Sequence, residues 1–320
     1  MKGFIKKIII FSVLAILVVI AIVIGSNYIV KTQSRFDISK DISTLVLGHS
    51  HSQCSINDSI LHNSINLSAS GESYFYNYQK LKKVVKANGY IKKVFIEFAN
   101  NHVDSVMDDW TWGYEKMSYY LPYYSPYMDF EDFNLLFEHN STDLLASYSI
   151  ATRKHLYRIL GGNFDLIDDI GGFLGSKHSK VDELIAKNNF NSSISKSHTL
   201  SETNLNYLRK MIEFCRENNV RVFLIRSPQH PLYADLSNEA IYQNVKHTRF
   251  NDVDLLDFDA MQFPNKYYLD LHHLNYKGAN QFTTLFNDLL KSNLLNADDK
   301  QAIIDARIKD FNTKQIKPNF

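Results

Sequence analysis

Apolar residues are spread unevenly along the chain: one long run lies near the N-terminus, and short runs alternate with polar or helix-periodic stretches further on. The long run covers Ile8 to Ile24 and is interrupted only by Ser12. A bilayer core of about 30 Å needs about 20 apolar residues in a helix, and about 17 still suffice. The run therefore predicts a helix that can cross a membrane.

The residues beside this run indicate its orientation. Lys2, Lys6 and Lys7 precede it, and positive residues stay on the cytoplasmic side. We expect a cytoplasmic tip and transmembrane anchor over residues 1–26, a polar stalk over 27–40, and an extracytoplasmic domain over 41–320. The expected location is the cell membrane, crossed once, with the C-terminal domain outside the cytoplasm.

A cleaved signal peptide is the alternative reading of the same run. Signal peptides usually have an apolar region of about 7–15 residues that ends at small residues before the cleavage site. The run here is longer, and the following Gly25-Ser26-Asn27-Tyr28 is a poor cleavage site, so the pattern favours the anchor. Both readings place the rest of the chain outside the cytoplasm, which disfavours kinases, ATPases and other users of soluble nucleotides.

Short apolar runs in the rest of the chain predict five strands, separated by segments of helical periodicity. The strands are expected at residues 43–47, 64–67, 93–98, 220–225 and 253–258, and the helices at 80–88, 204–218 and 276–290. Strands that alternate with helices indicate a parallel sheet with helical crossovers. The predicted class is α/β, with helices on both faces of the sheet.

A long segment between the third and fourth strands interrupts this order. A crossover needs only about a dozen residues, so we expect an insertion over about 102–200, helical around 131–139 and 143–160. Its first third is rich in aromatic residues. Trp110 and Trp112 are candidate substrate contacts, because flat aromatic faces stack on sugar rings. The alternative is that these aromatic residues pack a small core of the insertion itself.

Polar residues follow the predicted strands where each one ends. In open parallel sheets, ligands bind at the carboxyl ends of the strands, so these residues are candidates for a site. The segments are Gly48-His49-Ser50-His51-Ser52, Ser68–Ser73, Ala99–His102, Arg226–Pro231 and, past the fifth strand, Asp270–Asn275. We therefore expect small, polar and titratable groups to gather at one edge of the sheet.

Ser50, His273 and Asp270 are the candidate catalytic residues. A serine hydroxyl needs a base within hydrogen-bond reach, and the base needs an orienting partner. Asp270 and His273 are three residues apart, so one turn of chain can present both side chains. Ser52 and His272 are the alternatives for nucleophile and base.

Negative charge on a substrate oxygen needs fixed hydrogen-bond donors. The backbone N–H groups of Ser50 and Gly71 and the side-chain amide of Asn100 are the candidates, with Asn101 as the alternative to Asn100. Arg226 is a further candidate contact, for an anionic substrate group.

At these residues the chain resembles the SGNH (GDSL-like) hydrolase superfamily. The matching blocks are Gly48-His49-Ser50, Gly71, Asn100 and Asp270-Leu271-His272-His273. The Asp usual before the nucleophile is His49 here, and the third block lacks its usual glycine. The resemblance covers roughly residues 43–100 and 220–292. It implies a flavodoxin-like three-layer fold, and ester hydrolysis or acyl transfer through an acyl-serine.

The N-terminal anchor makes the chain similar to the membrane-anchored acyltransferase branch of that superfamily, which includes DltD-like proteins. This resemblance implies an acylated glycan or envelope polysaccharide as substrate, and a membrane-bound O-acyltransferase as partner. The alternative from another class is a catalytically silent scaffold of the same fold that binds glycan or organises an envelope assembly.

Other chemistries have less support. A catalytic metal held by His49, His51, His272, His273 and Asp270 is the chemical rival, but a third histidine cluster with metal-site spacing is lacking, and we expect no metal. We also expect no cofactor, because no phosphate-binding or dinucleotide-binding motif occurs. The net charge of +1 disfavours a nucleic-acid partner, which needs a basic face. Two cysteines are too few for a disulfide scaffold and could pair once or not at all.

Overall fold

The computed structural model of the chain describes residues 1–187, 199–233 and 238–316. One parallel five-stranded sheet lies in this part, with the strand order β2-β1-β3-β4-β5, which is flavodoxin-like. The strands are β1 (Thr44–Leu47), β2 (Ser64–Asn66), β3 (Lys93–Glu97), β4 (Arg221–Arg226) and β5 (Leu255–Asp257). The predicted α/β class and its five strands are confirmed, because each strand lies within two residues of its expected bounds.

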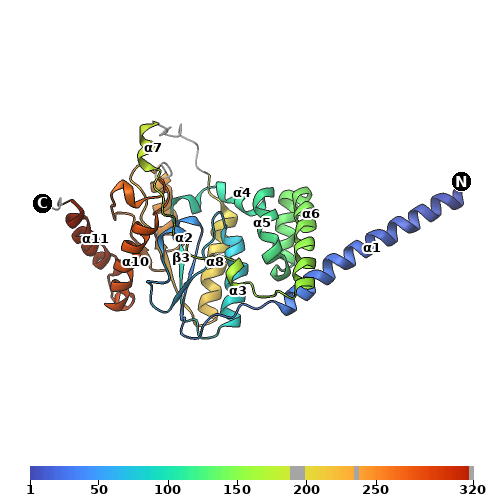
Figure 1. Ribbon diagram of the computed structural model, residues 1–320, viewed down its shortest axis with the longest axis horizontal. Helices are drawn as coiled ribbons and strands as arrows, with labels where there is room; N and C mark the ends of the chain where they lie inside the picture. The colour runs from blue at the N-terminus through green and yellow to red at the C-terminus, as the bar shows by residue number, and fades with distance from the viewer. Residues whose placement is uncertain (188–198, 234–237, 317–320) are drawn as a thin grey trace. The chain divides into compact units, whose positions relative to one another are not determined.

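Helices cover both faces of the sheet (Figure 1). On one face α3 (Tyr74–Ala87) contacts α8 (Glu202–Glu217), and on the other α2 (Ser50–Ser55) contacts α10 (Tyr276–Lys291). The helix expected at 80–88 begins earlier, at Tyr74. Further helices in the described part are α4 (Val106–Trp112), α7 (Val181–Ala186), α9 (Glu239–Arg249) and α11 (Lys300–Ile316).

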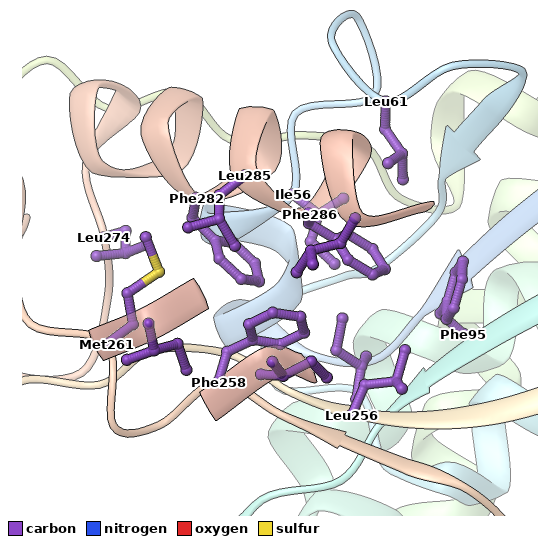
Figure 2. Close-up of a cluster of buried hydrophobic side chains, with 14 of the residues drawn as sticks. Ile56, Leu61, Phe95, Leu256, Phe258, Met261, Leu274, Phe282, Leu285 and Phe286 are labelled. Carbon is purple, nitrogen blue, oxygen red and sulfur yellow. The ribbon is translucent and has the colours of Figure 1, made fainter. Parts of the chain in front are cut away.

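An aromatic core holds α10 on the sheet (Figure 2). The rings of Phe282 and Phe286 on α10 lie 5.1 and 5.5 Å from the ring of Phe258, which follows β5. Phe286 also meets Phe95 of β3 at 5.1 Å. All four side chains are fully buried, and burial of each contributes roughly 1.5–3 kcal/mol. This packing fixes the start of α10, and therefore the loop that precedes it.

The chain divides into two compact units. The first, here called the anchor unit, comprises Met1–Asp37 and Thr111–Leu166; the second, the sheet unit, comprises Ile38–Trp110 and Ile167–Phe320. The part of the expected insertion that belongs to the anchor unit is therefore shorter than 102–200. Residues 188–198 of that segment lie outside the described residues.

The anchor unit is helical. It contains α1 (Lys2–Gln33), α5 (Tyr114–Tyr124) and α6 (Phe130–Gly161), and α6 contacts both of the others. The two helices expected at 131–139 and 143–160 are confirmed as the two halves of α6, which is kinked at Asn140 (φ −158°, ψ 71°). The Asn140 side chain donates a hydrogen bond to the backbone oxygen of Trp112 at 3.0 Å.

The first helix is longer than expected. The stalk predicted over 27–40 is wrong for its first half, because α1 continues to Gln33. No glycine or proline lies between Ser26 and Gln33 to end the helix. Val30 is fully buried within the anchor unit, so packing holds this last stretch in helical form.

Candidate active site

Ser50 lies at the first position of α2, directly beyond the carboxyl end of β1. The turn between them is tight: a Cβ on Gly48 would lie 2.3 Å from Ser52 Oγ and 2.6 Å from Glu97 Oε2. Only glycine fits this approach. The turn therefore brings the Ser50 side chain to the carboxyl edge of the sheet, where substrates of parallel α/β proteins bind.

His273 and Asp270 lie beside Ser50. The Nε2 atom of His273 lies 2.8 Å from Ser50 Oγ, and its Nδ1 atom lies 2.9 Å from Asp270 Oδ1 and 3.1 Å from Oδ2. The three side chains thus form a continuous line of hydrogen bonds across 223 residues of sequence. The His273 and Asp270 side chains are 19% and 28% exposed, so the line is accessible from solvent.

The loop before α10 presents the acid and the imidazole together. Asp270 Oδ1 accepts hydrogen bonds from the backbone N–H groups of His272 and His273, at 2.8 and 2.9 Å. Backbone bonding between Leu269 N and His273 O, at 2.8 Å, closes the same loop. The side chain of Asn275 caps α10 through Lys277 N and Gly278 N. The loop is therefore held at both ends, and the two catalytic candidates need no induced rearrangement to pair.

The charge on Asp270 sets the tautomer of His273. Burial alone would raise the pKa of the Asp270 carboxyl, but the hydrogen bond from His273 and the backbone donor of His272 outweigh it, and the pKa is lowered overall. The carboxylate therefore accepts the proton on Nδ1. This leaves the lone pair of Nε2 directed at the Ser50 hydroxyl, the arrangement that a general base requires.

The alternative nucleophile and base occupy other environments. Ser52 is fully buried, and its Oγ donates to Glu97 Oε2 at 2.5 Å. The ring of His272 lies 4.5 Å from that of Tyr233 and stacks beside His273. Ser50 and His273 are thus the pair that the geometry brings together.

The candidate oxyanion donors differ in their surroundings. Gly71 adopts φ +74°, a left-handed conformation that glycine favours. Its loop is bound to the nucleophile turn by the hydrogen bond from Ala69 N to Gly48 O, at 3.1 Å. An oxyanion role for Gly71 and for the Ser50 N–H stays a prediction.

Asn100 is engaged elsewhere. Its amide nitrogen donates to Glu239 Oε2 at 2.7 Å, and its oxygen accepts from Arg226 at 2.6 Å. The side chain of Asn101 meets His49 Nε2 at 2.9 Å. Neither amide has a hydrogen bond that directs it toward Ser50, so this geometry gives an Asn100 oxyanion role no support.

Arg226 is a buried centre of ion pairs. It is 2% exposed, and its guanidinium lies 2.8, 3.3 and 3.0 Å from carboxylate oxygens of Glu239, Asp257 and Asp259 respectively. A guanidinium surrounded by three carboxylates has no free face for an anionic substrate. The geometry therefore supports a structural role for Arg226 rather than the expected substrate contact.

The two tryptophans fall in different units. Trp110, in the sheet unit, meets the ring of His49 edge-on at 5.4 Å. Trp112, in the anchor unit, stacks on His139 at 3.8 Å. A sugar-stacking role for either residue stays a prediction.

Sequence reasoning missed a buried polar cluster behind the nucleophile, composed of Glu97, His49, His51 and His102. Glu97 Oε2 accepts from His49 N at 3.2 Å and from both the N–H and the Oγ of Ser52, at 2.9 and 2.5 Å. These bonds hold the residue before Ser50 and the second residue after it. Glu97 therefore holds the turn on which the nucleophile sits. A carboxylate inside the otherwise apolar run 94–98 was the available signal.

Burial sets the charges in this cluster. It raises the pKa of Glu97 to about 7, although hydrogen bonds from Ser52 and His49 oppose the rise. It lowers the pKa of His49 to about 3, and those of His51 and His102 well below the ordinary value. The three histidines are therefore neutral at pH 7, and the carboxyl has no cationic partner among them.

His49, Glu97 and His102 bring possible metal-ligand atoms within 4.8 Å of one another. However, the two imidazole rings stack at 4.2 Å and 18°, so their in-plane lone pairs cannot converge on one ion. The Nδ1 atoms of both rings also accept backbone N–H groups. The geometry fits a packed neutral cluster better than a metal centre.

Comparison with known proteins adds little to this geometry. One protein-family model, of a family with no described activity, matches residues 175–295. This segment includes Asp270 and His273 but not Ser50, and it covers less than half of the chain. No curated protein matches the chain.

Proposed function

We propose that the chain is an SGNH-type serine esterase or O-acyltransferase. The observation that carries the proposal is the line of hydrogen bonds from Ser50 Oγ through His273 to Asp270, with 2.8 and 2.9 Å separations. The strand order and the position of Ser50 after β1 agree with the fold that this superfamily implies.

The chemistry follows from the tautomer. Ser50 Oγ attacks the acyl carbonyl while His273 Nε2 takes its proton, and Asp270 stabilises the imidazolium that forms. Collapse of the tetrahedral intermediate returns this proton to the leaving alcohol, which departs, and leaves an acyl-serine. Water or a sugar hydroxyl then attacks the acyl-serine and gives its proton to His273 Nε2. The bond between the acyl group and Ser50 Oγ breaks, and His273 returns the proton to Ser50 Oγ. The N–H groups of Ser50 and Gly71 are the proposed oxyanion donors.

The long N-terminal helix supports a location at the membrane. α1 is long and apolar enough to cross a bilayer, which suits a signal anchor or a signal peptide. We favour the anchor, because Ser26 and Val30 near its end are buried in the anchor unit. Acylated envelope polysaccharide is the proposed substrate, and a membrane-bound O-acyltransferase is the proposed partner that supplies the acyl group.

The test is the Ser50→Ala variant of the full chain, purified in detergent. The parent should bind a fluorophosphonate label covalently and hydrolyse an aryl acetate. The variant should lose the label, and its turnover should fall about 10³-fold or more. Ser59→Ala removes an exposed hydroxyl from the loop after α2 and is the matched control, which should behave like the parent.

Two results would contradict the proposal. Labelling and turnover by Ser50→Ala at the parent's level would remove Ser50 as nucleophile. A folded parent that neither labels nor turns over ester would instead support a silent scaffold.

A further inference from the structure

An apolar groove runs between α1 and α6 in the anchor unit. Its volume is about 790 Å³. α1 lines it from Val19 to Lys31, and α6 lines it with Phe133, Leu145 and Tyr148, among others. Figure 1 shows α1 continuing well past the part that lies beside α6.

Folded contacts hold the walls of this groove together. Ser125 Oγ donates to Asn27 Oδ1 at 3.0 Å. Past the end of α1, Arg35 N donates to Phe164 O at 2.8 Å, and Leu166 N donates to Arg35 O at 3.1 Å. The end of α6 therefore lies level with the end of α1, and the groove opens from there toward the N-terminal half of α1.

The groove lies at a defined depth if α1 spans the membrane. About 20 residues cross the hydrocarbon core, so a span that begins at Ile8 ends near Asn27. Val19 is eight residues before Asn27, or about 12 Å deeper along the helix. Val19 to Ile24 thus line the groove inside the hydrocarbon, whereas Tyr28 and Lys31 line its outer end, at the level where aromatic and basic side chains meet headgroups.

Its walls are apolar and exposed. Leu145 is 62% and Ile24 is 64% exposed, so both would contact water if the groove were empty outside a membrane. A spanning helix of 10 Å diameter occupies about 2,400 Å³, three times the groove volume. A flexible chain fits this space better than a second helix.

We propose that an acyl chain of an outer-leaflet phospholipid fills this groove, with its headgroup beside Lys31, so that α6 dips into the membrane next to the anchor. This inference rests on the proposed anchoring of α1, and it does not depend on the proposed catalytic chemistry.

The experiment uses the full chain in phosphatidylcholine vesicles that contain phosphatidylcholine with a diazirine midway along one acyl chain. After illumination, peptide mass spectrometry locates the lipid adducts. We expect adducts on α6 at Leu145, Tyr148 or Ser149, in addition to adducts on α1. Leu145→Asp places a charge in the apolar wall of the groove and should reduce the α6 adducts about tenfold or more.

Two internal controls accompany the variant. Leu160→Asp changes an α6 residue that is 84% exposed but does not line the groove, and it should leave the α6 adducts unchanged. Adducts on Ile9 to Ile16, which lie on α1 before the groove, should be the same in all three proteins and report insertion of the anchor.

The outcomes separate the two proposals. Adducts on α1 without adducts on α6 would overturn the lipid groove and leave the anchor intact. Adducts on neither helix would overturn the anchor, and the groove with it.

Discussion

The Asp270 carboxylate accepts hydrogen bonds from three donors: the Nδ1–H of His273 and the backbone N–H groups of His272 and His273. Asp270→Asn keeps an oxygen for the two backbone donors but offers an N–H₂ group to Nδ1. The imidazole must then carry its proton on Nε2, facing Ser50, where it cannot act as base. We expect ester turnover to fall by roughly 10³–10⁴-fold with little change in melting temperature.

Steady-state kinetics and thermal unfolding of purified variants check this prediction. Asp298→Asn, at an exposed aspartate near the start of α11, is the control and should retain the parent's turnover. An Asp270→Asn variant with more than a tenth of the parent's activity would show that the carboxylate is dispensable for the tautomer.

Glu97 gives a pH-dependent stability. Its pKa rises from 4.5 to about 7 on folding, mainly through burial. The folded protein therefore binds this proton more tightly than the unfolded chain does. The stabilisation is complete below about pH 4.5 and is lost as the pH rises to about 7. Glu97→Gln cannot titrate, so the melting temperature of the parent relative to this variant should fall across that window and stay level above it.

The histidines that face Glu97 are present in both proteins. Their contribution therefore largely cancels when the melting temperatures of the parent and the variant are compared. Melting temperatures of parent and Glu97→Gln, measured side by side across the window, give the answer. Glu115→Gln, at an almost fully exposed carboxylate, should show a constant difference from the parent. A constant difference for Glu97→Gln as well would mean that the buried carboxyl titrates at its ordinary pKa.

At the scale of elements, the sequence predicted what depends on short-range pattern and on sheet topology. The spacing of Asp270 and His273 places both on one loop, and the parallel arrangement sends that loop and Ser50 to the same edge of the sheet. The two helical stretches expected at 131–139 and 143–160 are the halves of α6 on either side of Asn140. Each of these predictions needs only local periodicity and the rule that parallel strands end together.

The surroundings of two predicted site residues depend on a distant partner. Asn100 and Arg226 both bind Glu239, which lies on α9, a helix that the apolar pattern does not indicate. From the sequence, an amide or guanidinium at a strand end is a candidate to bind substrate. The structure shows that a carboxylate 139 residues away binds the amide instead. Glu97 was missed because its partners, His49 and Ser52, come from the turn after the neighbouring strand β1 and from α2.

The length of α1 also depends on partners that are distant in the sequence. Residues 27–33 are polar enough to suggest a stalk, and local pattern alone favours that reading. Burial of Ser26 and Val30 within the anchor unit makes this stretch part of a folded helical body instead. Cleavage of α1 as a signal peptide would also remove these packed side chains. The stability of the anchor unit therefore depends on whether α1 is retained.

At the scale of the whole molecule, the proposed topology is testable because both native thiols are hidden. Cys54 and Cys215 are free and buried, and burial raises the pKa of each to about 12. A membrane-impermeant maleimide should therefore leave the native chain unlabelled. Ser39→Cys places a thiol at an exposed position beyond α1, and Gly3→Cys places one before the apolar run.

We expect intact cells to label Ser39→Cys on a full-length chain of about 37 kDa, and to leave Gly3→Cys unlabelled until the membrane is opened with detergent. The three lysines at the start of the chain hold that end inside, so only the far end of α1 meets the reagent. Labelling of Gly3→Cys in intact cells would reverse the orientation. Labelling of Ser39→Cys on a shortened chain that has lost its first helix would instead make α1 a signal peptide, and would remove the surface on which α6 packs.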